Sequence, residues 1–258
     1  VFSILYSLLP TILISLLFIY LSATYTPPNW NAGGPGKLTY FFSQPFVMSH
    51  YFQNFVLPIE LSADTDWTFI TGWKDYRIYA GLAFVFIMIY IAWQFSLNRI
   101  TRPISFGILW FFLALLPTSS IIPLAEVLND HRVFFPYIGL VMAFVWTITL
   151  LIYKNQEKLV RYPFVRYPTI LFILGVFVAH SYGTYQRNKV WSSGLNLWAD
   201  VAEKSPNNGR GLMNYGNELM AKGEFDKAWI QFQKAVKIWP YYSYLYINMG
   251  VLKGTPGQ

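Results

Sequence analysis

The chain has 258 residues, of which 55% are apolar and only 12% are charged, and its mean hydropathy is positive. Because an ordinary soluble domain carries about 25% charged residues, this composition argues against a soluble protein and indicates a membrane protein. The net charge of +7 does not indicate nucleic-acid binding, since the basic residues fall mostly in loops and in a polar C-terminal segment, and the absence of cysteine excludes disulfides and thiol chemistry.

Five apolar stretches are long enough to cross about 30 Å of hydrocarbon. They are expected at 1–22, 76–95, 104–123, 133–153 and 168–186. Pro117 and Pro123 interrupt the end of the third, which is therefore expected to finish in a broken, partly re-entrant segment. The first begins at Val1 without a methionine, a basic region or a cleavage site, so it is not a secretion signal, and the chain is expected to be the C-terminal part of a longer protein.

The short loops predict the orientation, because lysine and arginine concentrate in cytoplasmic loops. Two loops on the same side of the five spans carry Arg99, Arg102, Lys154, Lys158, Arg161 and Arg166. Residues 23–75, residues 117–132 and everything after 187 are therefore expected on the outer side. The sequence predicts an integral membrane protein, of the bacterial inner membrane, whose C-terminal segment lies in the periplasm.

The outer loop 23–75 contains a predicted interfacial helix at about 41–61. At 100° per residue its polar side chains gather on one face, which is expected to point to water; they are Ser43, Ser49, His50, Gln53 and Asn54. Asp64 and Asp66 follow in what is expected to be an exposed turn. Paired acids in such a turn are usually solvated, and a catalytic role for them is the weaker hypothesis.

Four ionisable residues stand together between the third and fourth spans: Glu126, Asp130, His131 and Arg132. In one interpretation they cap a helix and anchor it at the headgroups, with Arg132 paired to Glu126 or to a lipid phosphate. In the other, Arg132 and His131 hold an anionic headgroup such as a polyprenyl phosphate, and the carboxylates orient a sugar or acceptor. No spacing typical of a metal site, a nucleotide-binding loop or a serine hydrolase occurs, so neither a metal nor a cofactor is predicted.

Residues 188–258 change in composition and repeat at a fixed period. Asn214, Gly216 and Pro206 recur 34 residues later as Asn248, Gly250 and Pro240, and 34 residues is the tetratricopeptide period. The positions expected to pack the repeat helices are Gly216, Ala228, Phe232, Ala235, Pro240 and Gly250. One complete unit flanked by partial units is predicted. The expected fold is all-α: a polytopic membrane helix bundle at 1–187, with about five spans and an interfacial helix, followed by a soluble repeat array at 188–258.

The runs "SQPFVMSHYFQNFVLPIELSADTDW" and "LPTSSIIPLAEVLNDHRVFFPYIG", with the repeats after them, resemble the C-terminal half of the transmembrane-and-tetratricopeptide-repeat O-mannosyltransferases and their bacterial relatives. The resemblance extends from about residue 40 onward. It implies the GT-C membrane fold, a polyprenyl-phosphate-linked sugar as donor, and a protein hydroxyl as acceptor that the repeats recruit. It also implies that Arg132 contacts the donor phosphate.

The chain departs from the pattern of that family in one respect. The catalytic acid of GT-C enzymes lies in the first outer loop, which belongs to an N-terminal half that this chain lacks, and Asp64 and Asp66 do not match it by motif. The chain is therefore not expected to catalyse transfer alone. The alternative hypothesis is a non-catalytic membrane scaffold subunit of a larger respiratory or photosynthetic complex, whose repeats bind an outer protein partner. A transporter is less favoured, because the spans contain almost no charges.

Overall fold

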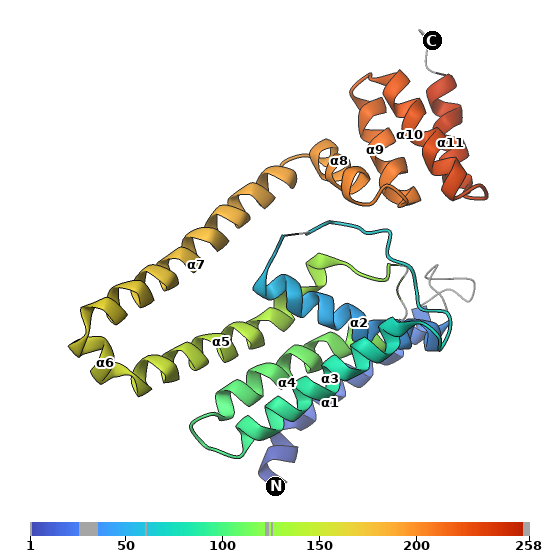
Figure 1. The fold of residues 1–258 in the computed structure, drawn as a ribbon. Helices are drawn as coiled ribbons and strands as arrows, with labels where there is room; N and C mark the ends of the chain where they lie inside the picture. The colour runs from blue at the N-terminus through green and yellow to red at the C-terminus, as the bar shows by residue number, and fades with distance from the viewer. Residues whose placement is uncertain (1, 26–35, 60, 122–123, 125, 255–258) are drawn as a thin grey trace. The chain divides into compact units, whose positions relative to one another are not determined.

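The computed structural model describes residues 2–25, 36–59, 61–121, 124 and 126–254, and the regular structure within them is helical (Figure 1). The chain divides into two compact units, 1–34 and 35–258. The first holds helix α1 (Phe2–Tyr25). The boundary predicted near residue 187 marks a change in composition. The compact units of the structure instead meet after Gly34.

The second to fifth predicted spans are confirmed as helices long and apolar enough to cross a membrane. They comprise Tyr76–Ser96, Arg102–Ser119, Asp130–Lys154 and Pro163–Val190. The first predicted span coincides with α1. The described apolar stretch of this helix, Leu9–Leu21, is shorter than the other four helices. Within the second unit, the turn between α3 (Tyr76–Ser96) and α4 (Arg102–Leu116) lies at the same end of the helices as α6 (Gln156–Arg161) (Figure 1).

The third span ends irregularly, as its prolines predict. Helix α4 runs into a five-residue π-helical segment, η1 (Pro117–Ile121), with a kink at Ser119. The chain regains regular structure in a short 3-10 helix, η2 (Asp130–Val133), which leads directly into α5 (Phe134–Lys154). Pro123 lies outside the described residues.

Helices α4 and α5 pack closely because each places a glycine at their crossing. A Cβ atom at Gly107 would collide with the carbonyl oxygen of Gly139 and lie 2.9 Å from the Cβ of Ala143. A Cβ at Gly139 would likewise collide with the carbonyl oxygen of Gly107. Small residues at such crossings are typical of membrane helices, where close backbone packing replaces the hydrophobic effect.

Helix α2 (Lys37–Val56) occupies the predicted interfacial segment, and the expectation that its polar face points to water is wrong for Ser43 and Asn54, whereas Gln53 is exposed as expected. Ser43 and Asn54 are only 2% and 4% exposed. The Ser43 hydroxyl accepts a hydrogen bond from the Ile70 N–H at 2.8 Å, and the Gln44 amide donates to the Val127 carbonyl at 3.4 Å. Two loops therefore cover part of this face and form hydrogen bonds with Ser43 and Gln44.

Helix α7 (Pro163–Val190) contains no buried residue. Four shorter helices follow it and share a separate core: α8 (Gly194–Lys204), α9 (Gly209–Ala221), α10 (Phe225–Ile238) and α11 (Ser243–Lys253). The turn between α9 and α10 contains Gly223 with φ of 77°, a left-handed conformation that favours glycine.

Candidate functional site

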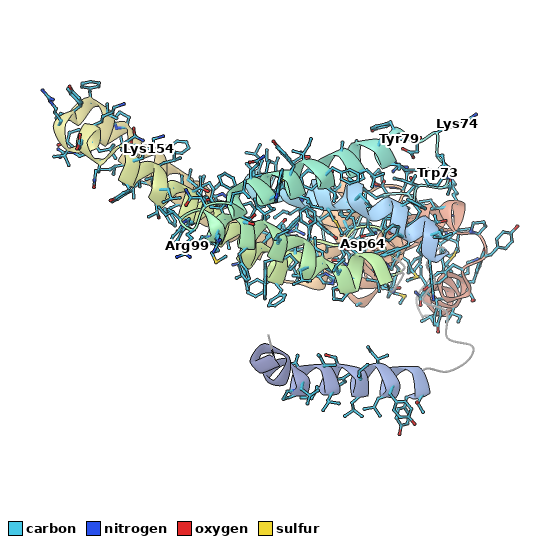
Figure 2. All side chains as sticks on the ribbon, turned by 90° about the horizontal axis from the view of Figure 1, so that it is seen from below. Asp64, Trp73, Lys74, Tyr79, Arg99 and Lys154 are labelled. Atoms are coloured by element: carbon cyan, nitrogen blue, oxygen red, sulfur yellow. The ribbon has the colours of Figure 1, made fainter. Side chains whose placement is uncertain are left out.

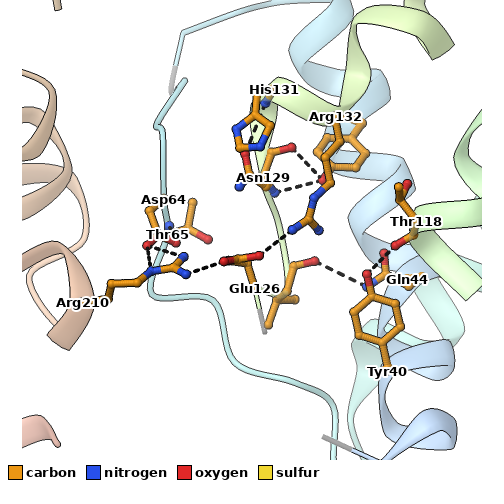
Figure 3. Close-up of polar contacts among 12 residues, drawn as sticks. Tyr40, Gln44, Asp64, Thr65, Thr118, Glu126, Asn129, His131, Arg132 and Arg210 are labelled. Atoms are coloured by element: carbon orange, nitrogen blue, oxygen red, sulfur yellow. Dashed lines mark hydrogen bonds and ion pairs between the residues drawn. The ribbon is translucent and has the colours of Figure 1, made fainter. Parts of the chain in front are cut away.

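Four charged side chains from three segments form a chain of alternating charge (Figure 3). Arg210 contacts Asp64 through its Nε at 2.7 Å and its Nη2 at 2.6 Å, and its Nη1 contacts Glu126 Oε1. The other oxygen of Glu126 accepts from Arg132 Nη2 at 2.5 Å. Glu126 is thus shared between two arginines that come from different parts of the fold.

Local structure holds each of these side chains in place. Asp64 lies in a bend in which the Ser62 hydroxyl donates to its carbonyl oxygen at 2.6 Å. Arg132 lies in η2, which Asn129 caps by accepting from the His131 N–H at 3.3 Å. Arg210 lies in the first turn of α9, where the cap residue is Asn208.

Burial and charge act in opposite directions on Glu126. Burial raises the pKa of its carboxyl group, but the hydrogen bond and positive charge of Arg210, together with the charge of Arg132, lower it below the usual value. Burial lowers the pKa of Arg210, whereas its bonds to Glu126 and Asp64 raise it above the usual value. At neutral pH Glu126 and Arg210 therefore face each other as a carboxylate and a guanidinium cation.

The four residues predicted to act together are separated in the structure, three of them between two networks. Glu126 and Arg132 belong to the ion-pair chain. Asp130 instead accepts from the Ser62 N–H at 2.7 Å and from the Asn54 amide at 3.5 Å, so it ties the loop at 61–70 to α2. His131 has an exposed side chain at the surface of η2.

A buried tyrosine supports the segment between these two networks. The Tyr51 hydroxyl donates to the Asn129 carbonyl at 3.1 Å and accepts from the Asn129 N–H at 3.0 Å. Burial raises the pKa of Tyr51 to about 12, so the hydroxyl keeps the proton that the first of these bonds requires. Tyr51 thereby fixes the residue that caps η2, three positions before Arg132.

The expectation of an exposed, solvated turn at Asp64 and Asp66 is wrong for Asp64. Its side chain is only 4% exposed because Arg210 covers it. Asp66 accepts from the Asn207 N–H at 3.3 Å. Both acids contact residues at the start of α9, which lies more than 140 positions further along the chain.

The predicted repeat positions lie mostly in the core of α9 and α10. Ala228, Phe232 and Ala235 are fully buried, and a Cβ at Gly216 would lie 2.5 Å from the Phe232 ring. Two further positions, Pro240 and Gly250, are exposed, and no atom lies within 4 Å of a Cβ built at Gly250.

The sequence analysis missed Arg210, and one local signal could have identified it. A basic residue in the first turn of a helix faces the positive end of the helix dipole and is unfavourable without an acidic partner. The partners Glu126 and Asp64 are 84 and 146 positions away, so no spacing rule connects them to Arg210.

Within the described part of the chain, no group of three or more histidine, aspartate or glutamate side chains is placed to hold a metal ion. Comparisons of this chain with family models, with curated proteins and with solved structures found no match. The assignment to a family therefore stays a proposal.

Proposed function

We propose that this chain is the membrane and repeat portion of a GT-C-like glycosyltransferase. It would take a sugar from a polyprenyl-phosphate donor and pass it to a protein hydroxyl on the outer side of the membrane. One observation carries the proposal: Arg132, at the end of a span, and Arg210, at the start of α9, meet at Glu126. A site between the spans and the C-terminal helices suits a reaction that joins a membrane-bound donor to a soluble acceptor.

The chemistry of the pair supports a phosphate at Arg132. A guanidinium group binds phosphate and carboxylate in the same two-pronged geometry, so a donor phosphate can replace Glu126 as the partner of Arg132. Arg210 then remains as the partner of the displaced carboxylate. The leaving phosphate carries the charge that develops during transfer, and a fixed cation beside it lowers the barrier.

The proposal assigns the helices α8 to α11 to a tetratricopeptide array that recruits the acceptor protein. The 34-residue recurrence supports this assignment, as does the packing of Phe232 against Gly216 between α9 and α10. The proposed location is a bacterial inner membrane with the array in the periplasm. The basic loops support it, since Arg99 lies at the opposite end of the helices from Trp73 and Lys74 (Figure 2).

The test is transfer of sugar from a polyprenyl-phosphate donor to protein by the full-length gene product. Arg132→Ala should lower transfer by about 100-fold or more, the usual cost of removing one group that stabilises developing charge. Arg132→Lys keeps the charge and should lose less. Arg99→Ala, at the opposite end of the spans, is the matched control. Transfer at the normal rate by a folded Arg132→Ala variant would contradict the proposal.

A second candidate, a non-catalytic scaffold subunit, is favoured by a different observation. Each arginine of the cluster already pairs with a carboxylate, and α7 contains no buried residue that would engage it inside this chain. An unpacked span suits a partner helix of a larger complex. Extraction of native membranes in mild detergent separates the two candidates. A subunit should migrate within a stable larger complex that Arg132→Ala leaves intact, whereas the enzyme should migrate by itself.

A further inference from the structure

A groove of about 650 Å³ lies away from the ion-pair chain, at the ends of two candidate spans. It is lined by the end of α2 and the residues after it, by the first turns of α5, and by the last turns of α7. Lys204, at the end of α8, also lines the groove. The groove therefore extends from the region of the spans to the soluble helices.

The lining is amphipathic. The α2 and α5 sides contribute apolar or aromatic side chains, which are Phe55, Ile59, Tyr137 and Val141. The opposite side contributes two cations, Arg187 and Lys204. No aspartate or glutamate is among the described residues that line the groove.

The two cations share a single carboxylate that stands outside the lining. Arg187 contacts Asp200 at 2.7 Å and Lys204 contacts the other oxygen of Asp200 at 2.6 Å. This triad carries one excess positive charge. Asp130 also interacts with the charge of Arg187 and offsets part of this excess, while the Ser62 N–H and the Asn54 amide hold its carboxylate outside the groove lining.

Aromatic rings lie beside two basic residues near the end of α7. The guanidinium of Arg187 lies 5.8 Å from the centre of the Trp191 ring, and the Lys189 ammonium lies 4.5 Å from that of Tyr185. Tryptophan and tyrosine are enriched where lipid headgroups meet the hydrocarbon. The apolar part of the groove then faces acyl chains, and the cations face phosphates.

We infer that the groove binds one anionic phospholipid of the surrounding membrane. Its phosphodiester lies between Arg187 and Lys204 and neutralises the excess charge, and one acyl chain follows the apolar side chains of α2 and α5. Lys204 also donates to the Leu61 carbonyl at 2.8 Å, so the bound lipid is connected to the outer loop. This inference does not rest on the proposed glycosyltransferase, because it concerns other residues and a lipid that is not consumed.

The test is native mass spectrometry of the full-length protein released from nanodiscs that contain equal parts of phosphatidylglycerol and phosphatidylcholine. Each basic residue near a phosphate contributes about a fivefold preference. After allowance for Asp200, we expect retention of one phosphatidylglycerol with a preference on the order of tenfold. Equal retention of both lipids would overturn the inference, as would retention of added polyprenyl phosphate with no phosphatidylglycerol.

Three variants separate lipid binding from the stability of the ion pairs. Arg187→Gln with Lys204→Gln removes both cations and should abolish the preference. Asp200→Asn breaks the same ion pairs but keeps both cations, so this variant should preserve or strengthen the preference for phosphatidylglycerol. Arg161→Gln with Arg166→Gln removes one basic residue from the end of α6 and one from the first turn of α7, far from Arg187, and should change nothing. Loss of the preference in the Asp200→Asn variant, or its survival in the first variant, would contradict the inference.

Discussion

At the scale of single residues, the carboxylate of Glu126 holds together segments that are far apart in the sequence. It accepts from Arg132 on one oxygen and from Arg210 on the other (Figure 3). The side chains of Glu126 and Arg132 are 20% and 12% exposed, so water screens their attraction less than at an open surface. Loss of the negative charge would leave two neighbouring guanidinium groups with only Asp64 as an acid.

We therefore expect the contact between α9 and the loop at 61–70 to weaken at acidic pH. The pKa of Glu126 is lowered in the folded state, so its contribution is fully present above the unfolded-state value of about 4.3 and is lost as the pH falls below it. Hydrogen exchange of the amides at 61–70, corrected for intrinsic rates, should show protection that is constant near neutral pH and falls below about pH 4.3.

The substitution Glu126→Gln should reproduce the acidic state at neutral pH. A half-buried ion pair of this kind contributes about 2 kcal/mol, so exchange should rise by roughly 30-fold. Glu224→Gln, which removes the exposed pair with Lys227 on α10, is the matched control and should leave these amides unchanged. Unchanged protection in Glu126→Gln would mean that other contacts hold the loop.

The sequence predicted half of this cluster. Arg132 and Glu126 are six positions apart in one short segment, and their pairing was one of two expected outcomes, which the structure confirms. The role of Arg210 could not be predicted, because its partners become neighbours only after the spans return the chain to the same end. Asp64 was expected to be exposed for the same reason, since its cover comes from α9.

At the scale of helices, the sequence predicted the spans better than the faces they present. The bilayer fixes the length of an apolar helix. Hydropathy therefore located the four candidate spans, and most of the predicted ends lie within a few residues of the observed ones. The buried polar face of α2 was not predictable from its periodicity. A polar face turns to water only when nothing else offers hydrogen bonds, and here Ile70 and Val127 do so.

The crossing of α4 and α5 allows a prediction with an internal control. Glycine to alanine in a helix is normally stabilising by about 0.5–1 kcal/mol. Gly175, in α7, has no atom within 4 Å of a built Cβ, so Gly175→Ala should be neutral or stabilising. At Gly107 the added methyl group meets the backbone of Gly139, and forcing the helices apart costs about 1–3 kcal/mol.

Thermal unfolding in detergent measures both variants. Gly107→Ala should lower the midpoint by about 2–12 °C, given about 2–4 °C per kcal/mol in a domain of this size. Gly175→Ala should leave the midpoint unchanged or raise it slightly. A Gly107→Ala protein as stable as the parent would show that α4 and α5 do not approach as closely as the structure has them.

At the scale of the molecule, the candidate spans and the C-terminal helices of the second unit are joined through the loop at 61–66. Besides Arg210, the Asn208 amide donates to the Thr65 carbonyl at 2.9 Å, and Lys204 donates to the Leu61 carbonyl. The loop at 61–66 thus contacts the ends of α8 and α9 while Asp130 and Ser62 connect it to the spans. The arrangement requires that the loop and the C-terminal helices lie on the same side of the membrane.

The absence of cysteine makes that requirement directly testable. Four exposed positions are suitable for single cysteines: Lys74 before α3, Arg99 after α3, Lys154 at the end of α5 and Tyr241 after α10. If α3, α4, α5 and α7 all cross the membrane, an impermeant maleimide added to intact cells should label Lys74→Cys and Tyr241→Cys. Arg99→Cys and Lys154→Cys, at the opposite end of the helices from Lys74 (Figure 2), should react only after permeabilisation. Labelling of Lys154→Cys from outside would mean that α4 or α5 does not span, and protection of Tyr241→Cys would place the C-terminal helices on the wrong side to contact the loop.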